Sequence, residues 1–107
     1  MSLIKHFVDG KTFEGSSKRT SKVFNPAIGE QISTVSLASK DDVNLVVQKA
    51  KKAFNDWSNK PPVIRARVLF KFKEIIEKNS DELTKLIVLE HGKVYDDAKG
   101  SLTRGLE

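Results

Sequence analysis

The chain has 107 residues, a net charge of +5, and a hydrophobic fraction of 38%, which is too high for intrinsic disorder. A chain of this length supports one hydrophobic core. It contains no cysteine, which excludes disulfide bonds, thiolate zinc sites and a thiol nucleophile within these residues. No apolar segment reaches the roughly 20 residues of a membrane span, and the first residues lack the apolar core of a signal peptide. We therefore expect a folded cytoplasmic protein without a membrane partner, or a mitochondrial matrix protein if the source is eukaryotic.

The first third of the sequence has the character of short strands and turns. The dipeptide Asp9-Gly10 suits a two-residue hairpin turn between residues 5–8 and 11–14. This hairpin is expected to place Phe7 and Phe13 on the same side. A second pair of strands is expected over 22–24 and 31–37, joined by a turn that contains proline and glycine.

A long helix is predicted to begin after Ser39, which together with Asp42 resembles a capping box. The helix should stop near Asn59, because Pro61 and Pro62 cannot continue it. Its apolar residues recur every three or four positions and predict one buried face: Val43, Val46, Val47, Ala50, Phe54 and Trp57.

Three further helices are predicted. One begins at Pro62, and the next is capped by Ser80 and ends at Gly92. In the last helix no stop signal follows Leu106, so we expect the natural chain to continue and this helix to expose apolar surface. The apolar stripes of the three helices are Val68, Leu69, Phe72, Ile75 and Ile76, then Leu83, Leu86, Ile87 and Leu89, then Tyr95, Ala98, Leu102 and Leu106.

The predicted fold class is α+β. Two short β-ribbons occupy residues 1–38, about four helices occupy residues 39–107, and the whole is expected to be a single N-terminal segment of a longer fold.

Residues that carry chemistry are sparse. The chain has no glycine-rich nucleotide motif, no phosphate loop and no hydrolase or zinc-protease motif. The acidic pairs at 41–42, 81–82 and 96–97 all fall in first turns of predicted helices, where negative charge stabilises the helix dipole. His91 beside Glu90 is assigned a surface position at a helix end, and two distant histidines make a poor metal site. These patterns therefore indicate no catalytic, cofactor-binding or metal-binding residue.

Six basic and only two acidic residues lie between positions 60 and 78. Such a cluster can bind nucleic acid. The cations point in different directions around the helix, however, and the aromatic residues lie largely on its apolar side. A solvated face, or one that meets another part of a larger protein, is the favoured interpretation.

Six motifs occur in the order found at the start of aldehyde dehydrogenases. The chain resembles this family over essentially its whole length, and most closely the acylating methylmalonate-semialdehyde dehydrogenase branch. The ending Arg104-Gly-Leu-Glu supports that branch, whereas Ser101 stands where the branch usually has glutamate. The six motifs are Phe7–Lys11, Phe24–Glu30, Ala50–Trp57, Arg65–Phe70, Glu90–Lys93 and Asp97–Gly100.

The resemblance implies an oxidoreductase that oxidises malonate or methylmalonate semialdehyde with NAD and transfers the acyl group to coenzyme A, with loss of carbon dioxide, as in valine catabolism. In this family a cysteine is the nucleophile. That cysteine and the nucleotide-binding core are expected beyond these residues, so the chain alone should bind neither cofactor and be inactive. Its implied partners are the remainder of its own polypeptide and further copies in a homo-oligomer.

One site residue follows from the resemblance. Arg104 is similar to an arginine that holds the substrate carboxylate in the full-length enzyme, a task suited to the planar guanidinium group, and it is expected to have no function in the isolated chain. Two alternatives remain open at this point: a stand-alone interaction module and a basic nucleic-acid-binding domain.

Overall fold

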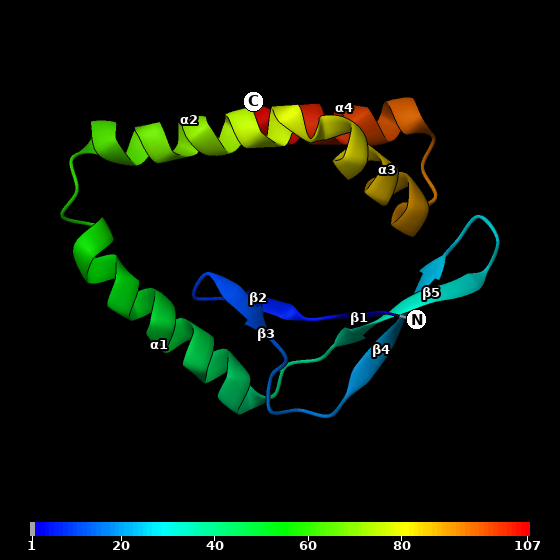
Figure 1. Cartoon of the computed structure of the whole chain (residues 1–107), viewed down its shortest axis with the longest axis horizontal. Coiled ribbons are helices and arrows are strands. Elements are labelled where there is room, and N and C mark those ends of the chain that lie inside the picture. Colours follow the sequence, from blue (N-terminus) through cyan, green and yellow to red (C-terminus); the bar gives the residue numbers. More distant parts are fainter. Residues whose placement is uncertain (1) are drawn as a thin grey trace. The chain divides into compact units, whose positions relative to one another are not determined.

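The computed structural model describes residues 2–107 and confirms the change from strands to helices near Ser39 (Figure 1). Contacts divide the described chain into two compact units, one formed by residues 2–24 and 31–60, the other by residues 25–30 and 61–107. The elements in order are β1 Ser2–Ile4, β2 His6–Val8, β3 Lys11–Phe13, β4 Thr20–Asn25, β5 Glu30–Ser36, α1 Lys40–Trp57, α2 Pro62–Lys78, α3 Ser80–His91 and α4 Tyr95–Leu106.

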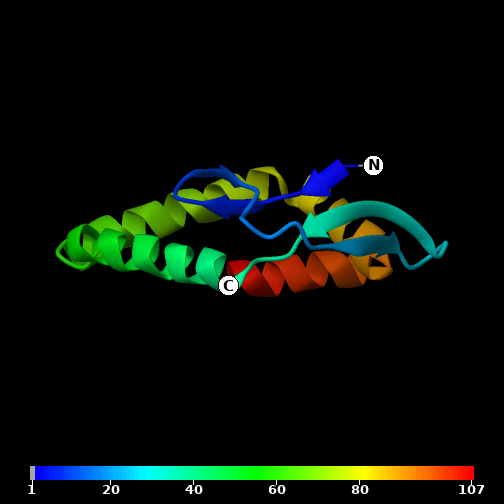
Figure 2. The same cartoon turned by 90° about the horizontal axis from the view of Figure 1, so that it is seen from below.

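The larger sheet has three strands in the order β1-β5-β4. The predicted pair β4 and β5 is confirmed as a curved hairpin, seen in cyan in Figures 1 and 2. The first strand, β1, was not predicted. It pairs in parallel with β5, with Leu3 opposite Thr34. Three residues are too few to show the alternation by which a strand is recognised in a sequence.

The predicted hairpin of β2 and β3 is confirmed. Asp9 and Gly10 have positive φ angles of 54° and 77°, as a tight two-residue turn requires. The expectation that Phe7 and Phe13 share a side is wrong. The turn sets Phe13 opposite His6 and Phe7 opposite Thr12, so the two phenylalanines lie on opposite faces of the ribbon.

The long helix α1 begins as predicted. Ser39 Oγ accepts a hydrogen bond from the amide of Asp42, and the Asp42 carboxylate accepts one from the amide of Ser39. Both views show α1 as a straight, unbroken helix (Figures 1 and 2). It ends at Trp57, ahead of Pro61 and Pro62, and Pro62 is the first residue of α2.

The boundary between α2 and α3 differs from the prediction in one respect. Asn79, not Ser80, is the N-cap of α3, and no side chain caps this end. Ser80 is already helical, and its carbonyl oxygen accepts a hydrogen bond from Thr84 Oγ1 at 2.7 Å. At the other end Gly92 adopts the predicted left-handed conformation, with φ of 77°.

The helices α3 and α4 pack against each other and contain the completely buried side chains of the second unit. Thr84 and Ala98 have no exposed surface. Leu102 and Leu106 are half-buried. The prediction that the last helix exposes its apolar stripe holds for Tyr95, which is 39% exposed, and is wrong for Ala98, which is buried.

The apolar surface left exposed lies mainly on α1 and α2. The predicted burial of the α1 face is wrong, since Phe54 is 63% exposed and Trp57 is 38% exposed. The apolar side chains of α2 are uncovered as well, including Val68, Phe72 and Ile75. The periodicity identified the apolar face of each helix, but most of the side chains on these two faces are exposed within residues 2–107.

The close approach of Gly92 to Pro26 allows a test of the packing within the second unit. A Cβ at this position would lie 2.9 Å from Pro26 Cγ, in addition to the strain of φ 77°. Gly10 has the same φ but open space around it. We expect Gly10→Ala to lower the free energy of unfolding by about 1 kcal/mol, and Gly92→Ala by at least about 2 kcal/mol, measured by urea denaturation. Equal losses would contradict the contact with Pro26.

Candidate functional site

Arg104, in the last turn of α4, folds back along its own helix. Its Nη2 donates a hydrogen bond to Ser101 Oγ at 3.1 Å. Its Nη1 lies over Gly100, since a Cβ added to that glycine would be 3.5 Å away. Ser101 Oγ itself donates to the carbonyl oxygen of Asp97 at 3.2 Å. The guanidinium group is thus oriented, yet it stays exposed and retains donors for an external anion.

Lys93 reaches the same hydroxyl group from the loop between α3 and α4. Its Nζ donates to Ser101 Oγ at 3.0 Å, and its side chain is partly buried. Within the described chain, neither Lys93 nor Arg104 forms an ion pair with a carboxylate. No sequence pattern assigned Lys93 a role, because the contact crosses the turn made by Gly92. The structure therefore places a second cation, Lys93, near Arg104, the site residue that the resemblance implied.

Asp42 has a structural role at the N-terminus of α1. Its two carboxylate oxygens accept hydrogen bonds from the amides of Ser39 and Ser16, both at 2.8 Å. Only 4% of Asp42 is exposed. The Ser39 amide above all, opposed by burial and assisted by the bonds from Ser16, holds the pKa of Asp42 well below its usual range. This carboxylate is fully engaged and is not a free acid or base.

The lowered pKa of Asp42 predicts a dependence of stability on pH. Its ionised form stabilises the fold above the unfolded pKa of about 4, and this contribution disappears as the pH falls through the folded pKa. We expect the free energy of unfolding, measured with urea, to drop more between about pH 7 and about pH 3 in the wild type than in Asp42→Asn. The matched variant Asp41→Asn should keep the full drop. An undiminished drop in Asp42→Asn would contradict the assignment.

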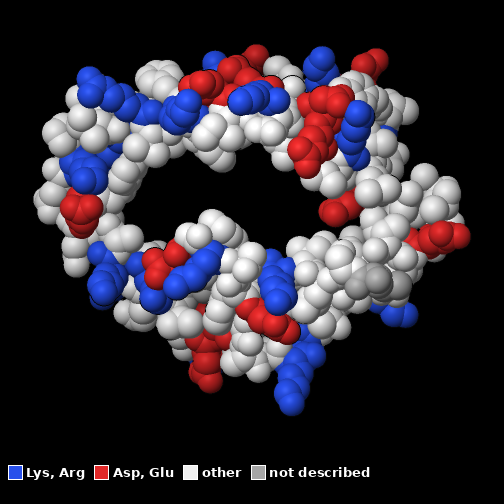
Figure 3. Space-filling view, in the orientation of Figure 1, with Lys and Arg blue, Asp and Glu red and all other residues white. Residues whose placement is uncertain are grey.

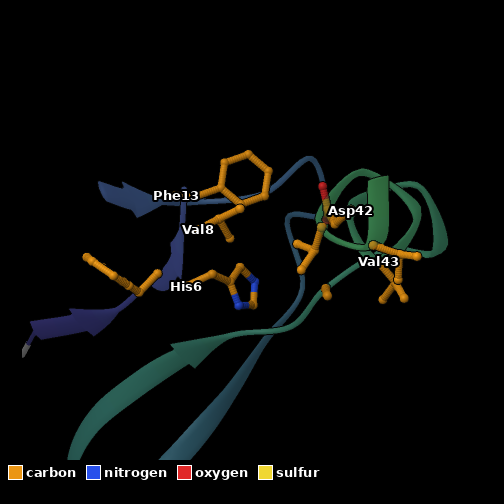
Figure 4. Close-up of a pocket in the computed structure, with 9 residues that line it drawn as sticks. His6, Val8, Phe13, Asp42 and Val43 are labelled. Atoms are coloured by element: carbon orange, nitrogen blue, oxygen red, sulfur yellow. The ribbon is translucent and has the colours of Figure 1, made fainter. Parts of the chain in front are cut away.

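The first unit contains a pocket of about 290 Å³ between the β2–β3 hairpin and α1. Figure 4 shows His6 pointing from β2 into this space, below Phe13 and Val8. The His6 Nε2 atom is buried and has no hydrogen-bond partner in the described chain. The other walls are mostly apolar, and the Asp42 carboxylate is already engaged. The pocket therefore lacks a set of groups for catalysis. The residues that line it are His6, Phe7, Val8, Phe13, Ala38, Asp42, Val43, Val46 and Val47.

Asp81, at the start of α3, also has structural partners. Asp81 accepts hydrogen bonds from Lys85 and from the Tyr95 hydroxyl, each at 2.7 Å. Lys85 first, then Tyr95, lowers the pKa of Asp81, and the same contact raises the pKa of Tyr95. His91 is exposed at the end of α3. Residues 2–107 contain no cluster of three or more side chains arranged to hold a metal ion.

The basic residues of α2 are partly neutralised. Lys71 pairs with Glu74 at 3.0 Å, and Lys73 pairs with Glu77 at 3.6 Å. Figure 3 shows acidic and basic side chains mixed over this helix. This mixture favours the predicted solvated face over a continuous surface for nucleic acid. Among residues 2–107, none of the helices has an apolar stretch that would span a membrane.

Two solved structures share this fold closely. The methylmalonate-semialdehyde dehydrogenase of Oceanimonas doudoroffii superposes with a TM-score of 0.94 at 43% identity, over 99% of this chain and 22% of its own. A Sinorhizobium meliloti 1021 protein assigned to the same activity and complexed with NAD gives a TM-score of 0.96 at 46% identity, with the same coverage. These neighbours confirm the predicted α+β fold as the N-terminal part of a larger one.

Sequence comparisons agree with the structures. The malonate-semialdehyde dehydrogenase of Bacillus pumilus (strain SAFR-032) is 39% identical over 107 residues, which is 100% of this chain and 22% of the relative. The chain thus spans about a fifth of the length of the relatives it matches. The model of the aldehyde dehydrogenase family matches residues 13–107. Because that match takes in most of the chain, from the last residue of β3 to the end of α4, the chain belongs to the aldehyde dehydrogenase family.

Proposed function

We propose that this chain is the N-terminal segment of an NAD-dependent, coenzyme A-acylating dehydrogenase of malonate or methylmalonate semialdehyde. The observation that supports the proposal most is the alignment of nearly the whole chain with about a fifth of a malonate-semialdehyde dehydrogenase, at 39% identity, and of a solved structure assigned as a methylmalonate-semialdehyde dehydrogenase, at 46% identity. An oriented, exposed Arg104 without an ion-pair partner in the described chain is consistent with it. Arg104 would hold the carboxylate of the semialdehyde through charge-assisted hydrogen bonds.

The junction between β5 and α1 does not fit the phosphate groups of a nucleotide cofactor. A phosphate group favours a helix N-terminus that follows a strand, and β5 and α1 form such a junction. The junction already holds the anionic Asp42, whose carboxylate accepts the amides of Ser39 and Ser16. A pyrophosphate group would be repelled there. We therefore assign NAD, coenzyme A and the catalytic cysteine to residues outside this chain, and expect the chain alone to be inactive.

The partner proposed for the exposed helices is the rest of the same polypeptide, within a homo-oligomeric enzyme. The apolar side chains of α1 and α2 are unburied, as expected for helices that cover another body. A basic surface that binds nucleic acid does not require helices with exposed apolar side chains. This feature favours an enzyme segment over an independent nucleic-acid-binding domain.

The test is to express the complete reading frame that contains residues 1–107 and to follow NADH formation. We expect oxidation of malonate semialdehyde that requires both NAD and coenzyme A. The 107-residue chain, assayed alongside, should give only background. A complete product without this activity, or turnover by the 107-residue chain, would contradict the proposal.

A further inference from the structure

We propose that the β4–β5 turn, residues 25–30, positions Arg104 through the contact of Pro26 with Gly92. This inference rests on the proposed function, in which Arg104 holds the substrate carboxylate. The turn does not touch the substrate in this assignment. Pro26 and Gly92 are positioning residues, and they act through the connection between α3 and α4.

The β4–β5 turn is held in one shape by its first residue. The Asn25 carbonyl oxygen accepts hydrogen bonds from the amides of Gly29 at 2.9 Å and Ile28 at 3.3 Å. The Asn25 side chain accepts a third hydrogen bond, from the amide of Ala27 at 3.0 Å. Pro26 adds a fixed φ angle. All of these contacts are made by residues 25–29, so they do not depend on the remainder of the polypeptide.

The Pro26 ring lies against the C-terminal end of α3. A Cβ added to Gly92 would be 2.9 Å from Pro26 Cγ and 3.6 Å from Pro26 Cβ, so the ring leaves no room for a side chain there. Gly92 is the left-handed C-cap of α3, and its amide donates to the Val88 carbonyl oxygen at 2.9 Å. Groups packed this closely transmit a displacement to their neighbours. Pro26 therefore fixes the point at which the chain leaves α3.

Two hydrogen bonds connect that point to Arg104. Lys93 follows Gly92 directly, and its Nζ donates to Ser101 Oγ at 3.0 Å. Arg104 Nη2 donates to the same Oγ at 3.1 Å. The helix that carries Ser101 and Arg104, α4, also packs against α3. A shift of the chain at Gly92 thus reaches the guanidinium group by two routes, the Lys93 side chain and the packing of α3 against α4.

The test is a double-mutant cycle in the complete enzyme, read as the ratio of kcat/KM for malonate semialdehyde to kcat/KM for propanal. Gly92→Ala places a Cβ against Pro26 Cγ and should lower this ratio by about ten-fold, because a small misplacement of a binding group slows the reaction strongly. Pro26→Ala removes Cγ and leaves Cβ at an ordinary distance, so adding it to Gly92→Ala should restore most of the ratio. A loss of folded protein lowers both rates together and does not change the ratio.

Gly10→Ala is the matched control, because Gly10 has the same φ of 77° but open space around it. It should leave the ratio unchanged. Pro26→Ala alone inserts no bulk, so it tests the inference even if Gly92→Ala does not fold, and it should lower the ratio by about three-fold. An unchanged ratio in Pro26→Ala would overturn the inference, as would a double variant that is no better than Gly92→Ala.

Crystal structures of the complete wild-type and variant proteins give a readout that needs no activity. In Gly92→Ala the guanidinium group of Arg104 should move relative to the rest of the protein, and in the double variant it should return. A guanidinium that moves and returns in a complete protein that does not oxidise malonate semialdehyde would support the positioning role and refute the proposed function. An unmoved guanidinium in Gly92→Ala would overturn the positioning role.

Discussion

The 107-residue chain on its own is expected to self-associate and to bind an apolar fluorescent dye strongly. The reason is the amount of apolar surface on α2, where Val68 is 52% exposed and Phe72 is 59% exposed. On the other side of the same helix Phe70 is 71% exposed. A helix that is apolar on several sides is stable in water only when other elements cover it. In the absence of the proposed remainder of the polypeptide, further copies of the chain are the available cover.

Light scattering during size-exclusion chromatography would measure this association. The double variant Val68→Glu, Phe72→Glu should shift the chain toward the monomer by about ten-fold in dissociation constant, because it places charge on the exposed row. Lys18→Glu provides the control, since it changes the net charge by the same amount on an exposed loop residue. A wild-type chain that stays monomeric over a wide concentration range would refute the prediction, as would equal dissociation in the Lys18→Glu control.

Local structure followed from the sequence where a few neighbouring residues determine it. The turn at Asp9 and Gly10, the capping box of Ser39 and Asp42, and the end of α3 at Gly92 were all predicted. Burial was predicted less well. A stripe of apolar residues shows which side of a helix avoids water, but not which element covers it. The stripe of α4, which packs against α3, is partly buried, whereas most of the stripes of α1 and α2 are exposed within residues 2–107.

The candidate site was likewise predicted only in part. Arg104 came from a motif that resembles a known family, since its position on α4 alone would suggest only a solvated side chain. Lys93 could not have been placed beside it from sequence. The contact depends on the left-handed turn at Gly92 and on the packing of α3 against α4, which set the course of the chain before Ser101. Spacing within one helix carries no information about such a contact.

In the complete enzyme, Arg104→Met should lower kcat/KM for malonate semialdehyde by about 10- to 100-fold, the range expected when charge-assisted hydrogen bonds are lost. The activity with propanal, which lacks the carboxylate, should stay within about two-fold of the wild type, because no charged group needs the guanidinium. Arg104→Lys should keep part of the activity with malonate semialdehyde, since it retains the charge but not the planar pair of donors.

The control for this prediction is Arg67→Met, which removes an exposed arginine of α2. It should leave kcat/KM unchanged with both aldehydes. The ratio of the two substrates is the informative quantity, because a general loss of folding lowers both rates together whereas a lost carboxylate contact lowers only one. If Arg104→Met reduced the oxidation of propanal as much as that of malonate semialdehyde, Arg104 would be a structural residue of α4 and not part of the substrate site.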